Sequence, residues 1–352
     1  MGLPLGFAVV GLGAISRMHL ESITTIPEAR LVAAVDSRQS QVDAVVSEFG
    51  GIGYTDYVEA LANPDVDVVC ILTPSGARRD IAVAAAEAGK HVIVEKPVEI
   101  TVERIDDMIQ ACRRNGVILA GIFQFRFKPA WQFVKQAVAS GRLGKLVMGD
   151  AYNKWWRSQE YYDGSGWRGT WALDGGGALM NQGIHAIDLL QWIMGPVAEV
   201  SAYTGTLAHE RIEVEDTAVA AIKFASGALG VIEGTTSVYP GYTMRLELHG
   251  TEGSVVIQGD YITEWSVRNT SEAEMAQVRK YYAPESKQST ASDPAQTDCT
   301  WHRLQIADVV QSILEGREPL VSGEEGRKSV EIIRSIYESA RTGAPVKLSL
   351  GQ

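Results

Sequence analysis

The sequence predicts an α/β protein in which a doubly wound parallel sheet is followed by an α+β domain with an open, mostly antiparallel sheet. The first observation is a glycine-punctuated turn that follows an apolar run near the start of the chain. The second is a series of short, β-branched runs that alternate with helical segments up to about residue 123, as expected for strands covered on both faces. The third is a change to alternating strand patterns from about residue 144. We therefore expect two domains, 1–123 and 124–352.

The composition is that of a globular protein large enough for two hydrophobic cores, with 352 residues of which 45% are hydrophobic. The formal net charge of -11 argues against nucleic acid or an anionic membrane as a partner, because both require a clustered positive field. The three cysteines, Cys70, Cys112 and Cys299, lie far apart and lack the spacing of metal ligands. We therefore expect a cytoplasmic protein in a reducing compartment, with no metal in its active site.

The turn near the start of the chain predicts a dinucleotide site. The apolar run Phe7–Val10 passes into Gly11 and Gly13 and then into helix-forming sequence. The two glycines let the backbone turn sharply and approach a pyrophosphate, whose charge is met by free amides and the positive end of the helix dipole. Ser16 stands where the dinucleotide-binding pattern usually has a third glycine or an alanine, so the glycine pattern alone is weak evidence. The position of the turn in the first strand-turn-helix unit strengthens the prediction.

A second apolar run supports this interpretation. Leu31–Val35 ends on Asp36, about 20 residues after the turn, where a carboxylate can accept hydrogen bonds from the adenosine ribose. The same carboxylate would repel a 2′-phosphate, so we expect a preference for NAD over NADP. The guanidinium of Arg38 could reach a 2′-phosphate, which leaves use of NADP open.

Further elements complete the first half. Helices are expected over Gln39–Phe49, from just after Ser75 to Gly89, and over Thr101–Asn115. Strands are expected over Ile52–Tyr54, Val66–Leu72, His91–Val94 and Val117–Phe123. The strand ending at Val94 delivers Glu95, Lys96 and Pro97 at its carboxyl end, the edge of an open α/β sheet where ligands bind. From composition alone, a surface ion pair before a turn proline explains these residues equally well.

The second half of the chain has the alternating pattern that is typical of an antiparallel sheet. Strands are expected over Thr217–Phe224, Ala228–Glu233, Thr243–Leu248 and Ser254–Ile257, with a hairpin turn at Ser226-Gly227. The polar stretch Asn269–Asp298 is expected to be a long loop. Helices near Trp301–Glu315 and Glu324–Thr342 end the chain.

The segment Asn153–Asp174 gathers aromatic and basic residues in what we expect to be a loop: Trp155, Trp156, Arg157, Tyr161, Tyr162, Trp167, Arg168 and Trp171. Aromatic faces with guanidinium donors suit a sugar, which offers apolar C–H faces and hydroxyls. A dimer interface has the same composition and remains an alternative. The following segment, Gly175–Ile193, is expected to be a helix that places Asn181, His185 and Asp188 on one face.

Three stretches resemble the glucose-fructose oxidoreductase, inositol dehydrogenase and MocA (Gfo/Idh/MocA) family: G-L-G-A-I-S-R-M-H at 11–19, A-G-K-H-V-I-V-E-K-P at 88–97 and G-G-G-A-L-M-N-Q-G-I-H-A-I-D at 175–188. The resemblance implies a Rossmann domain and an NAD(P)-dependent dehydrogenase that oxidises a secondary ring hydroxyl of a sugar, sugar derivative or cyclitol. It places Lys96 beside the nicotinamide and makes His185 the acid/base. The position one turn earlier, commonly aspartate in the family, is Asn181 here, which puts a proton-carrying role for that residue in doubt.

The resulting site has three expected catalytic residues, Lys96, His185 and Asn181. Residues expected at the cofactor are Gly11, Gly13, Ala14, Ile15, Asp36, Ser37, Arg38, Thr73, Pro74, Glu95 and Lys96. Residues expected at the substrate are Lys96, Arg157, Trp167, Arg168, Asn181, His185 and His302, the last because it precedes a helix and could reach the cleft. The resemblance also implies a homodimer or homotetramer built on the open sheet.

Two other functions stay open from the sequence. One is a glycosidase that uses tightly held NAD for transient oxidation and elimination, and the other is a redox-silent NAD-binding regulator. Net formation of NADH separates the dehydrogenase from both. The sequence does not name the sugar or cyclitol.

Overall fold

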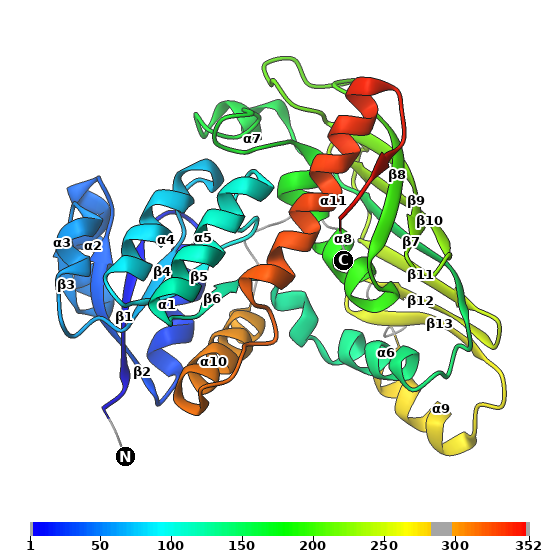
Figure 1. Cartoon of the computed structure of the whole chain (residues 1–352), viewed down its shortest axis with the longest axis horizontal. Coiled ribbons are helices and arrows are strands. Elements are labelled where there is room, and N and C mark those ends of the chain that lie inside the picture. Colours follow the sequence, from blue (N-terminus) through cyan, green and yellow to red (C-terminus); the bar gives the residue numbers. More distant parts are fainter. Residues whose placement is uncertain (1–2, 283–297, 350–352) are drawn as a thin grey trace. The chain divides into compact units, whose positions relative to one another are not determined.

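The computed structural model describes residues 3–282 and 298–349, which form two compact units (Figure 1). The first unit holds residues 3–124 and 298–330, and the second holds 125–282 and 331–349. The expected division at 123/124 therefore differs in one segment, because residues 298–330 group with the first unit. Helix α10 (Thr300–Glu315) packs against α1 (Ser16–Thr25), and its apolar face shares a core with the first strand.

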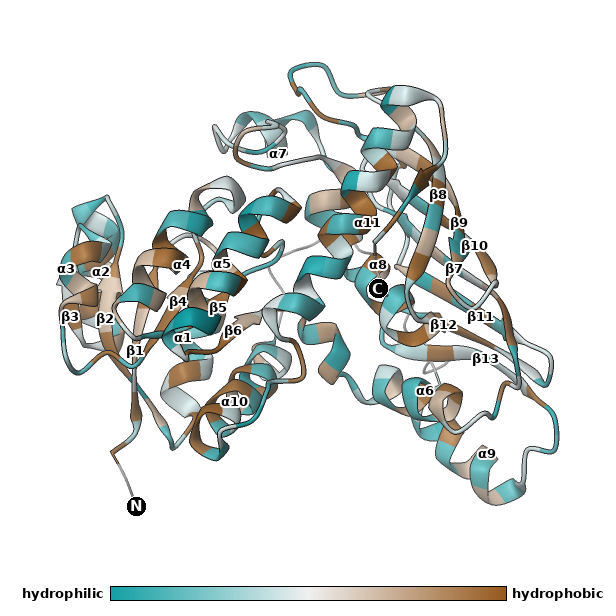
Figure 2. Cartoon of the chain, viewed as in Figure 1, coloured by the Kyte–Doolittle hydropathy of each residue, from teal (hydrophilic) through white to brown (hydrophobic). Residues whose placement is uncertain are grey.

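The first unit is built on a six-stranded sheet in the order β3-β2-β1-β4-β5-β6, with every pair parallel. Its strands are β1 (Leu5–Val10), β2 (Ala29–Val35), β3 (Ile52–Tyr54), β4 (Val68–Ile71), β5 (His91–Val94) and β6 (Leu119–Gly121). Figure 2 shows these strands as largely hydrophobic, as expected for strands buried on both faces. The strand order reverses between β1 and β4, and ligands of such sheets bind beyond the carboxyl ends of the strands at that point. The predicted doubly wound half is confirmed.

The helices of this unit follow the predicted pattern closely. Besides α10, they include α1, α2 (Gln39–Phe49), α3 (Tyr57–Leu61), α4 (Arg78–Glu87) and α5 (Val102–Asn115), with a short 3-10 turn η1 (Ser75–Ala77) before α4. Helix α5 has clear end signals, because the Thr101 side chain accepts the amide of Arg104 and Gly116 ends the helix in the left-handed conformation. Helix α3 was not predicted, since five residues are too few for a periodic pattern.

The second unit is built on an eight-stranded sheet in the order β13-β12-β11-β7-β10-β9-β8-β14. Its strands are β7 (Leu146–Lys154), β8 (Val197–Gly205), β9 (Thr217–Phe224), β10 (Leu229–Thr235), β11 (Arg245–Gly250), β12 (Gly253–Gln258), β13 (Tyr261–Val267) and β14 (Val346–Lys347). All pairs are antiparallel except β7 with β10, so the sheet is mixed but mostly antiparallel, as predicted. The hairpin at Ser226-Gly227 joins β9 to β10, with Gly227 at φ +88.

Several helices of the second unit correct the sequence interpretation. The stretch expected to be a loop from Asn269 holds α9 (Glu272–Val278) and η4 (Arg279–Tyr281), because Ser271 caps the amide of Glu274. The rest of that stretch, 283–297, lies outside the described residues. The expected loop 153–174 contains α7 (Gln159–Asp163). An unpredicted helix, α6 (Pro129–Ala139), begins with proline at its first turn.

The expected helix over 175–193 begins at Ala178, and its first part is π-helical. It begins as a π-helical turn, η3 (Ala178–Gly183), and continues as α8 (Ile184–Met194). Helix α11 (Gly323–Thr342) begins in the first unit and continues into the second. No helix among the described residues is long and apolar enough to cross a bilayer.

Candidate active site

The glycine turn of the first unit leaves space where a pyrophosphate would approach. Gly11 has φ +97, and a Cβ there would lie 2.8 Å from the amide nitrogen of Thr73, so only glycine fits without strain. A Cβ on Gly13, in contrast, would meet no atom within 4 Å and would project into open space. Helix α1 begins just beyond, at Ser16, whose Oγ donates to the carbonyl of Gly13 at 2.7 Å. A small serine therefore fits the third position, and the turn fits a dinucleotide.

Asp36, which is expected to bind the adenosine ribose, also shapes this turn. Its Oδ2 accepts the amide of Leu12 at 2.9 Å, and its Oδ1 accepts the amide and the Nε of Arg38, each at 3.0 Å. Burial acts to raise the pKa of Asp36, but the hydrogen bonds from Arg38 and Leu12 outweigh it and lower the pKa. Arg38 is exposed apart from this contact.

A cavity of about 430 Å³ borders the turn. Its lining comes from the turn, α1 and α2: Leu12, Gly13, Ala14, Ser16, Arg17, Leu20, Arg38, Gln41, Val45, Glu48 and Phe49. Ala14 is exposed beside it, Ile15 is half-buried at the start of α1, and Ser37 is exposed next to Arg38. The predicted cofactor residues of the first two strands are thus gathered at one place.

Arg78 organises the ends of β4 and β5 and was not predicted. Its buried guanidinium donates from Nε to the carbonyl of Thr73 at 2.9 Å, and from a terminal nitrogen to the carbonyls of Glu95 (2.5 Å) and Pro97. A cation in the first turn of a helix is opposed by the helix dipole. An arginine at the start of the alanine-rich α4 was therefore the sequence signal that could have identified Arg78 as a residue with a special role. Thr73 Oγ1 is buried and has no partner among the described residues, which suits a residue that awaits a ligand.

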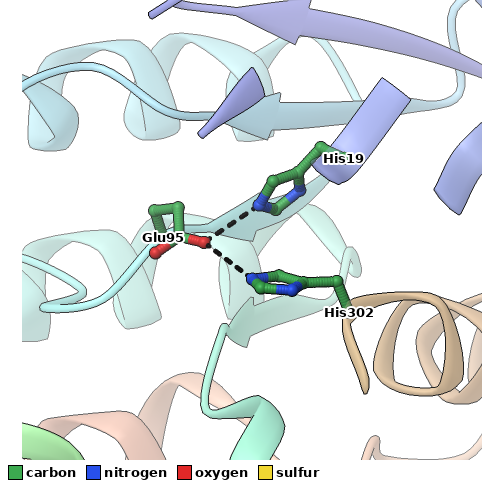
Figure 3. Close-up of side chains that lie close together, drawn as sticks. All are labelled: His19, Glu95 and His302. Carbon is green, nitrogen blue, oxygen red and sulfur yellow. Dashed lines mark hydrogen bonds and ion pairs between the residues drawn. The ribbon is translucent and has the colours of Figure 1, made fainter. Parts of the chain in front are cut away.

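Glu95 is buried in a cluster of two imidazoles (Figure 3). Its Oε1 lies 2.9 Å from Nε2 of His19 and 3.6 Å from Nε2 of His302, and its Oε2 accepts the amide of Lys96 at 3.0 Å. Burial acts to raise the pKa of Glu95, but the hydrogen bonds from His19 and His302 prevail and hold it well below its ordinary value. The alternative of a surface pair is wrong for Glu95, whereas Lys96 is half-buried and precedes a cis proline, Pro97.

His302 was expected to precede a helix, but it lies in the first turn of α10. Its ring lies edge-on to that of His19, with centroids 5.3 Å apart, and both belong to the first unit. The nearest donor atoms of His19, Glu95 and His302 lie within 4.8 Å of one another. The structure therefore ties His302 to the strand end that carries Lys96.

In the second unit, Asn181 lies in the π-helical turn and contacts a carboxylate that was not predicted. Its Nδ2 donates to Oδ1 of Asp174 at 2.9 Å, while Oδ2 of Asp174 accepts the amide of Gly169 at 2.9 Å. Asp174 is buried and directly precedes the glycine triplet of the motif. Position 181, where the family resemblance implies an aspartate, holds an asparagine here. The carboxylate of Asp174 nevertheless lies within hydrogen-bond distance of that side chain.

His185 lies in the first turn of α8 and stacks on an aromatic ring. Its centroid is 4.5 Å from that of Phe125 with the planes 21° apart, and Nζ of Lys128 lies 3.8 Å from the same Phe125 centroid. Asp188, expected on the same face, forms a buried bidentate pair with Arg126 at 2.6 and 2.8 Å. We conclude that Asp188 has a structural role and that Phe125 fixes one face of the imidazole.

Glu215 explains why the π-helical turn forms. Its carboxylate accepts the amides of Gly177 and Leu179 and the hydroxyl of Tyr337, each at 2.9 Å. A Cβ on Gly177 would lie 1.8 Å from the carbonyl oxygen of Glu215, so the glycine is required. Burial raises the pKa of Glu215 to about 7 in spite of these donors. The turn that carries Asn181 is therefore anchored by a residue from the start of β9.

Two arginines flank Tyr161 in the aromatic segment. The guanidinium carbon of Arg168 lies 4.4 Å and that of Arg157 lies 5.4 Å from the Tyr161 ring centroid, and Gln182 donates to the Tyr161 hydroxyl at 2.9 Å. Arg168 also lies over Trp167 at 5.2 Å. The Nε atoms of both arginines are buried and unpartnered among the described residues, and no ion pair with a carboxylate is found for either of them in that part of the chain. We call Arg157, Arg168 and Tyr161 the arginine pair site.

The backbone of this site is held by Asp216 and His209. Asp216 accepts the amides of residues 207–209 and the Nδ1 of His209, and Nε2 of His209 lies 2.9 Å from the carbonyl of Arg157. Burial acts to raise the pKa of Asp216, but these donors lower it to about 2. Tyr162 is buried and bonded to Thr236, while Trp156 and Trp171 are exposed, so only part of the aromatic segment belongs to the site.

Comparison with known proteins agrees with this architecture. Residues 5–123 match the family model of the oxidoreductase family with an NAD-binding Rossmann fold, and residues 131–256 match that of the GFO/IDH/MocA C-terminal domain. The WlbA dehydrogenase of Bordetella pertussis, solved with NADH and UDP-GlcNAcA, is 34% identical with a TM-score of 0.89, covering 99% of both chains. The WlbA dehydrogenase of Chromobacterium violaceum, solved with the same two ligands, is 33% identical with a TM-score of 0.89, covering 100% of this chain and 98% of that one.

A curated relative widens the range of substrates among these proteins. The myo-inositol 2-dehydrogenase of Thermotoga maritima is 28% identical over 346 residues, or 97% of each chain. The chain therefore belongs to the Gfo/Idh/MocA family. It is an oxidoreductase of a family of NAD-dependent sugar and cyclitol dehydrogenases, and the expected fold and cofactor are confirmed.

Proposed function

We propose that this chain oxidises a ring hydroxyl of a negatively charged sugar, with a nucleotide-linked uronic acid as the first candidate. The arginine pair site carries the proposal. Its two guanidinium groups lie beside aromatic rings and have no carboxylate partner within residues 3–282 and 298–349, which suits an anion attached to a sugar ring. Two relatives solved with UDP-GlcNAcA, at 34% and 33% identity, support this class over the inositol class, represented at 28%.

The chemistry assigns a separate task to each side chain. NAD, when bound, would accept a hydride from the carbon that bears the hydroxyl. His185 would take the hydroxyl proton, which contributes about 10²–10⁴-fold for a positioned imidazole, and its stacking on Phe125 would hold the ring in place. Lys96 would stabilise the developing charge on the oxygen, and Asn181, fixed by Asp174, would orient the substrate by hydrogen bonds.

The test is a measurement of NADH formation at 340 nm with four compounds. UDP-GlcNAcA carries both a diphosphate and a carboxylate, UDP-GlcNAc only the diphosphate, free N-acetylglucosaminuronic acid only the carboxylate, and myo-inositol neither. We expect the highest kcat/KM for UDP-GlcNAcA. Arg157→Met and Arg168→Met should raise KM for charged substrates by about 10-fold or more with a smaller change in kcat.

Three results would overturn this proposal. A preference for myo-inositol would remove the anionic substrate class, and substrate consumption without net NADH would favour the glycosidase. Binding of NAD with no turnover of any compound would favour the redox-silent regulator.

We also propose that the chain forms a homo-oligomer through the exposed face of the second sheet. Tyr203, Val219 and Glu233 are cross-strand neighbours on β8, β9 and β10, and Tyr203 is 84% exposed and Val219 45% exposed. Exposed apolar side chains in adjacent strands are typical of an interface. Light scattering after size exclusion should give a dimer or tetramer, and Val219→Lys should shift it toward the monomer.

A further inference from the structure

The buried cluster around Glu95 contains two side chains, His19 and Cys70, for which the proposed chemistry has no use. We propose that His19 is a positioning residue that holds Glu95, and through it the backbone of Lys96, and that Cys70 fixes the tautomer in which His19 does so. The part of this inference that concerns turnover rests on the proposed function. The part that concerns the proton on His19 does not.

The hydrogen atoms in the cluster can be assigned from donor and acceptor chemistry. Sγ of Cys70 lies 3.2 Å from Nδ1 of His19, and Nε2 of His19 lies 2.9 Å from Oε1 of Glu95. Burial, together with the charge of Glu95, raises the pKa of the Cys70 thiol well above its ordinary value, so the thiol keeps its proton and donates to Nδ1. A neutral imidazole that accepts at Nδ1 carries its hydrogen on Nε2 and donates it to Glu95.

The charges in the cluster are consistent with a neutral His19 ring. Burial lowers the pKa of His19 against the opposing effect of Glu95. The guanidinium of Arg78 donates to the backbone carbonyl of Glu95, and its charge also acts to lower the pKa of His19. The groups facing Glu95 are His19 from α1, Cys70 from β4, Arg78 from α4, His302 from α10 and Lys96 on its own strand end. Burial and the charge of Arg78 both favour a neutral His19 ring.

These contacts fix the backbone on both sides of Lys96. The Lys96 amide donates to Oε2 of Glu95 at 3.0 Å, and Arg78 holds the carbonyls of the residues before and after Lys96. Glu95 can present Oε2 to that amide only while Oε1 is held in place, and His19 supplies the shorter of the two imidazole contacts. Loss of such an outer contact moves a reacting group by a fraction of an ångström, which costs about 10–100-fold in turnover.

A metal bound by the same three side chains is the competing interpretation, since their donor atoms lie within 4.8 Å (Figure 3). A metal at Nε2 of His19 would require that nitrogen to be a lone-pair donor. The hydrogen bond to Glu95 requires it to carry a hydrogen. The two interpretations therefore predict opposite states of one atom.

The first experiment compares His19→Leu, which removes the donor, with His19→Gln, whose amide can place an N–H near the position of Nε2. Both variants are checked for folding by circular dichroism and for NADH binding by fluorescence. We expect His19→Leu to lower kcat about 10–100-fold with an NADH Kd within about 3-fold of wild type, and His19→Gln to recover most of the loss. Cys70→Ser should retain more activity than Cys70→Ala. Equal kcat for the Leu and Gln variants would overturn the inference.

The second experiment needs no turnover. Nitrogen-15 spectra of the protein with labelled histidine, with the His19 signals assigned by their loss in His19→Gln, report the tautomer directly. We expect a neutral ring with hydrogen on Nε2 from pH 5.5 to 8. A hydrogen on Nδ1, an imidazolium in this range, or stoichiometric metal by mass spectrometry would overturn the inference. If no sugar is oxidised, the proposed function fails while this measurement still decides the role of His19.

Discussion

Asn181 donates a hydrogen bond from Nδ2 to Oδ1 of Asp174 at 2.9 Å, and Asp174 is buried. A carboxylate at position 181 would therefore face another carboxylate at hydrogen-bond distance. Two such groups cannot both ionise, so one pKa rises above its unfolded value and the pair holds a proton.

The first prediction follows from this contact. In Asn181→Asp the folded state should bind an extra proton above pH 4, so its stability should fall as pH rises through the raised pKa. We expect the loss of Tm relative to wild type to be larger at pH 8 than at pH 5. Asn181→Ala is the control, because it removes the hydrogen bond without adding a charge and should lose Tm equally at both pH values. An equal loss in both variants would show that residues 174 and 181 are not coupled.

The second prediction concerns Glu215. Its pKa of about 7 in the folded protein lies above the ordinary 4.5, so its contribution to stability is fully present below pH 4.5 and is lost as pH rises through 7. We expect the Tm of wild type to decline between pH 5 and pH 8 and this slope to be smaller in Glu215→Gln, whatever its absolute Tm. Tyr337→Phe removes one donor but keeps the carboxyl group, so it should keep the slope. A slope unchanged in Glu215→Gln would assign the pH dependence to another group.

The third prediction concerns the buried pair of Arg126 and Asp188, whose side chains are 0% and 1% exposed. Removing one partner leaves an uncompensated buried charge, so Asp188→Leu should lower the free energy of unfolding by about 3–5 kcal/mol. The double variant Arg126→Met with Asp188→Leu should recover most of this loss, because an apolar pair of similar volume avoids the charge. Urea denaturation measures both. If the double variant were less stable than Asp188→Leu, the pair would be a net stabilising contact.

The elements with local signals were predicted well. Helix α2 has the expected bounds, Gln39–Phe49, and α5 is defined by Thr101 and Gly116 at its two ends, all within one stretch of sequence. The π-helical start of the segment after Gly175 was not predicted, because the same apolar spacing is compatible with a regular α-helix. What changes its path is Glu215, which lies about 36 residues further along the chain.

The candidate-site residues that were not predicted also act through contacts with residues distant in the sequence. Arg78 acts on carbonyls 17 and 19 residues away, and His19 meets Glu95 at a separation of 76 residues. Their partners are brought together by the parallel order of β1, β4 and β5, which local patterns do not encode residue by residue. The family motifs identified the segments that carry Lys96 and His185, but not the contacts that hold them.

The fourth prediction concerns the choice of cofactor. Asp36 binds the turn at Leu12 and also holds Arg38, so Asp36→Ala should both remove the repulsion of a 2′-phosphate and release the guanidinium. We expect the ratio of kcat/KM for NAD to that for NADP to fall by about 10-fold or more in this variant. Arg38→Ala should change the ratio in the opposite direction. Comparable efficiency with both cofactors in wild type would show that Asp36 does not control the choice.

The last prediction concerns Lys96, the half-buried residue whose backbone amide is held by Glu95 and whose neighbouring carbonyls are held by Arg78. A fixed ammonium that acts on charge developing at the substrate oxygen stabilises the transition state more than the ground state. Lys96→Met should therefore lower kcat by about 10³-fold while the Kd of NADH, measured by fluorescence, stays within a few-fold of wild type. Lys96→Arg is the matched control, since it keeps the positive charge on a side chain of different length. Its kcat should lie between those of wild type and Lys96→Met. A near wild-type kcat for Lys96→Met at saturating substrate would exclude Lys96 from the chemical step, whereas a large rise in the Kd of NADH would assign it to cofactor binding instead.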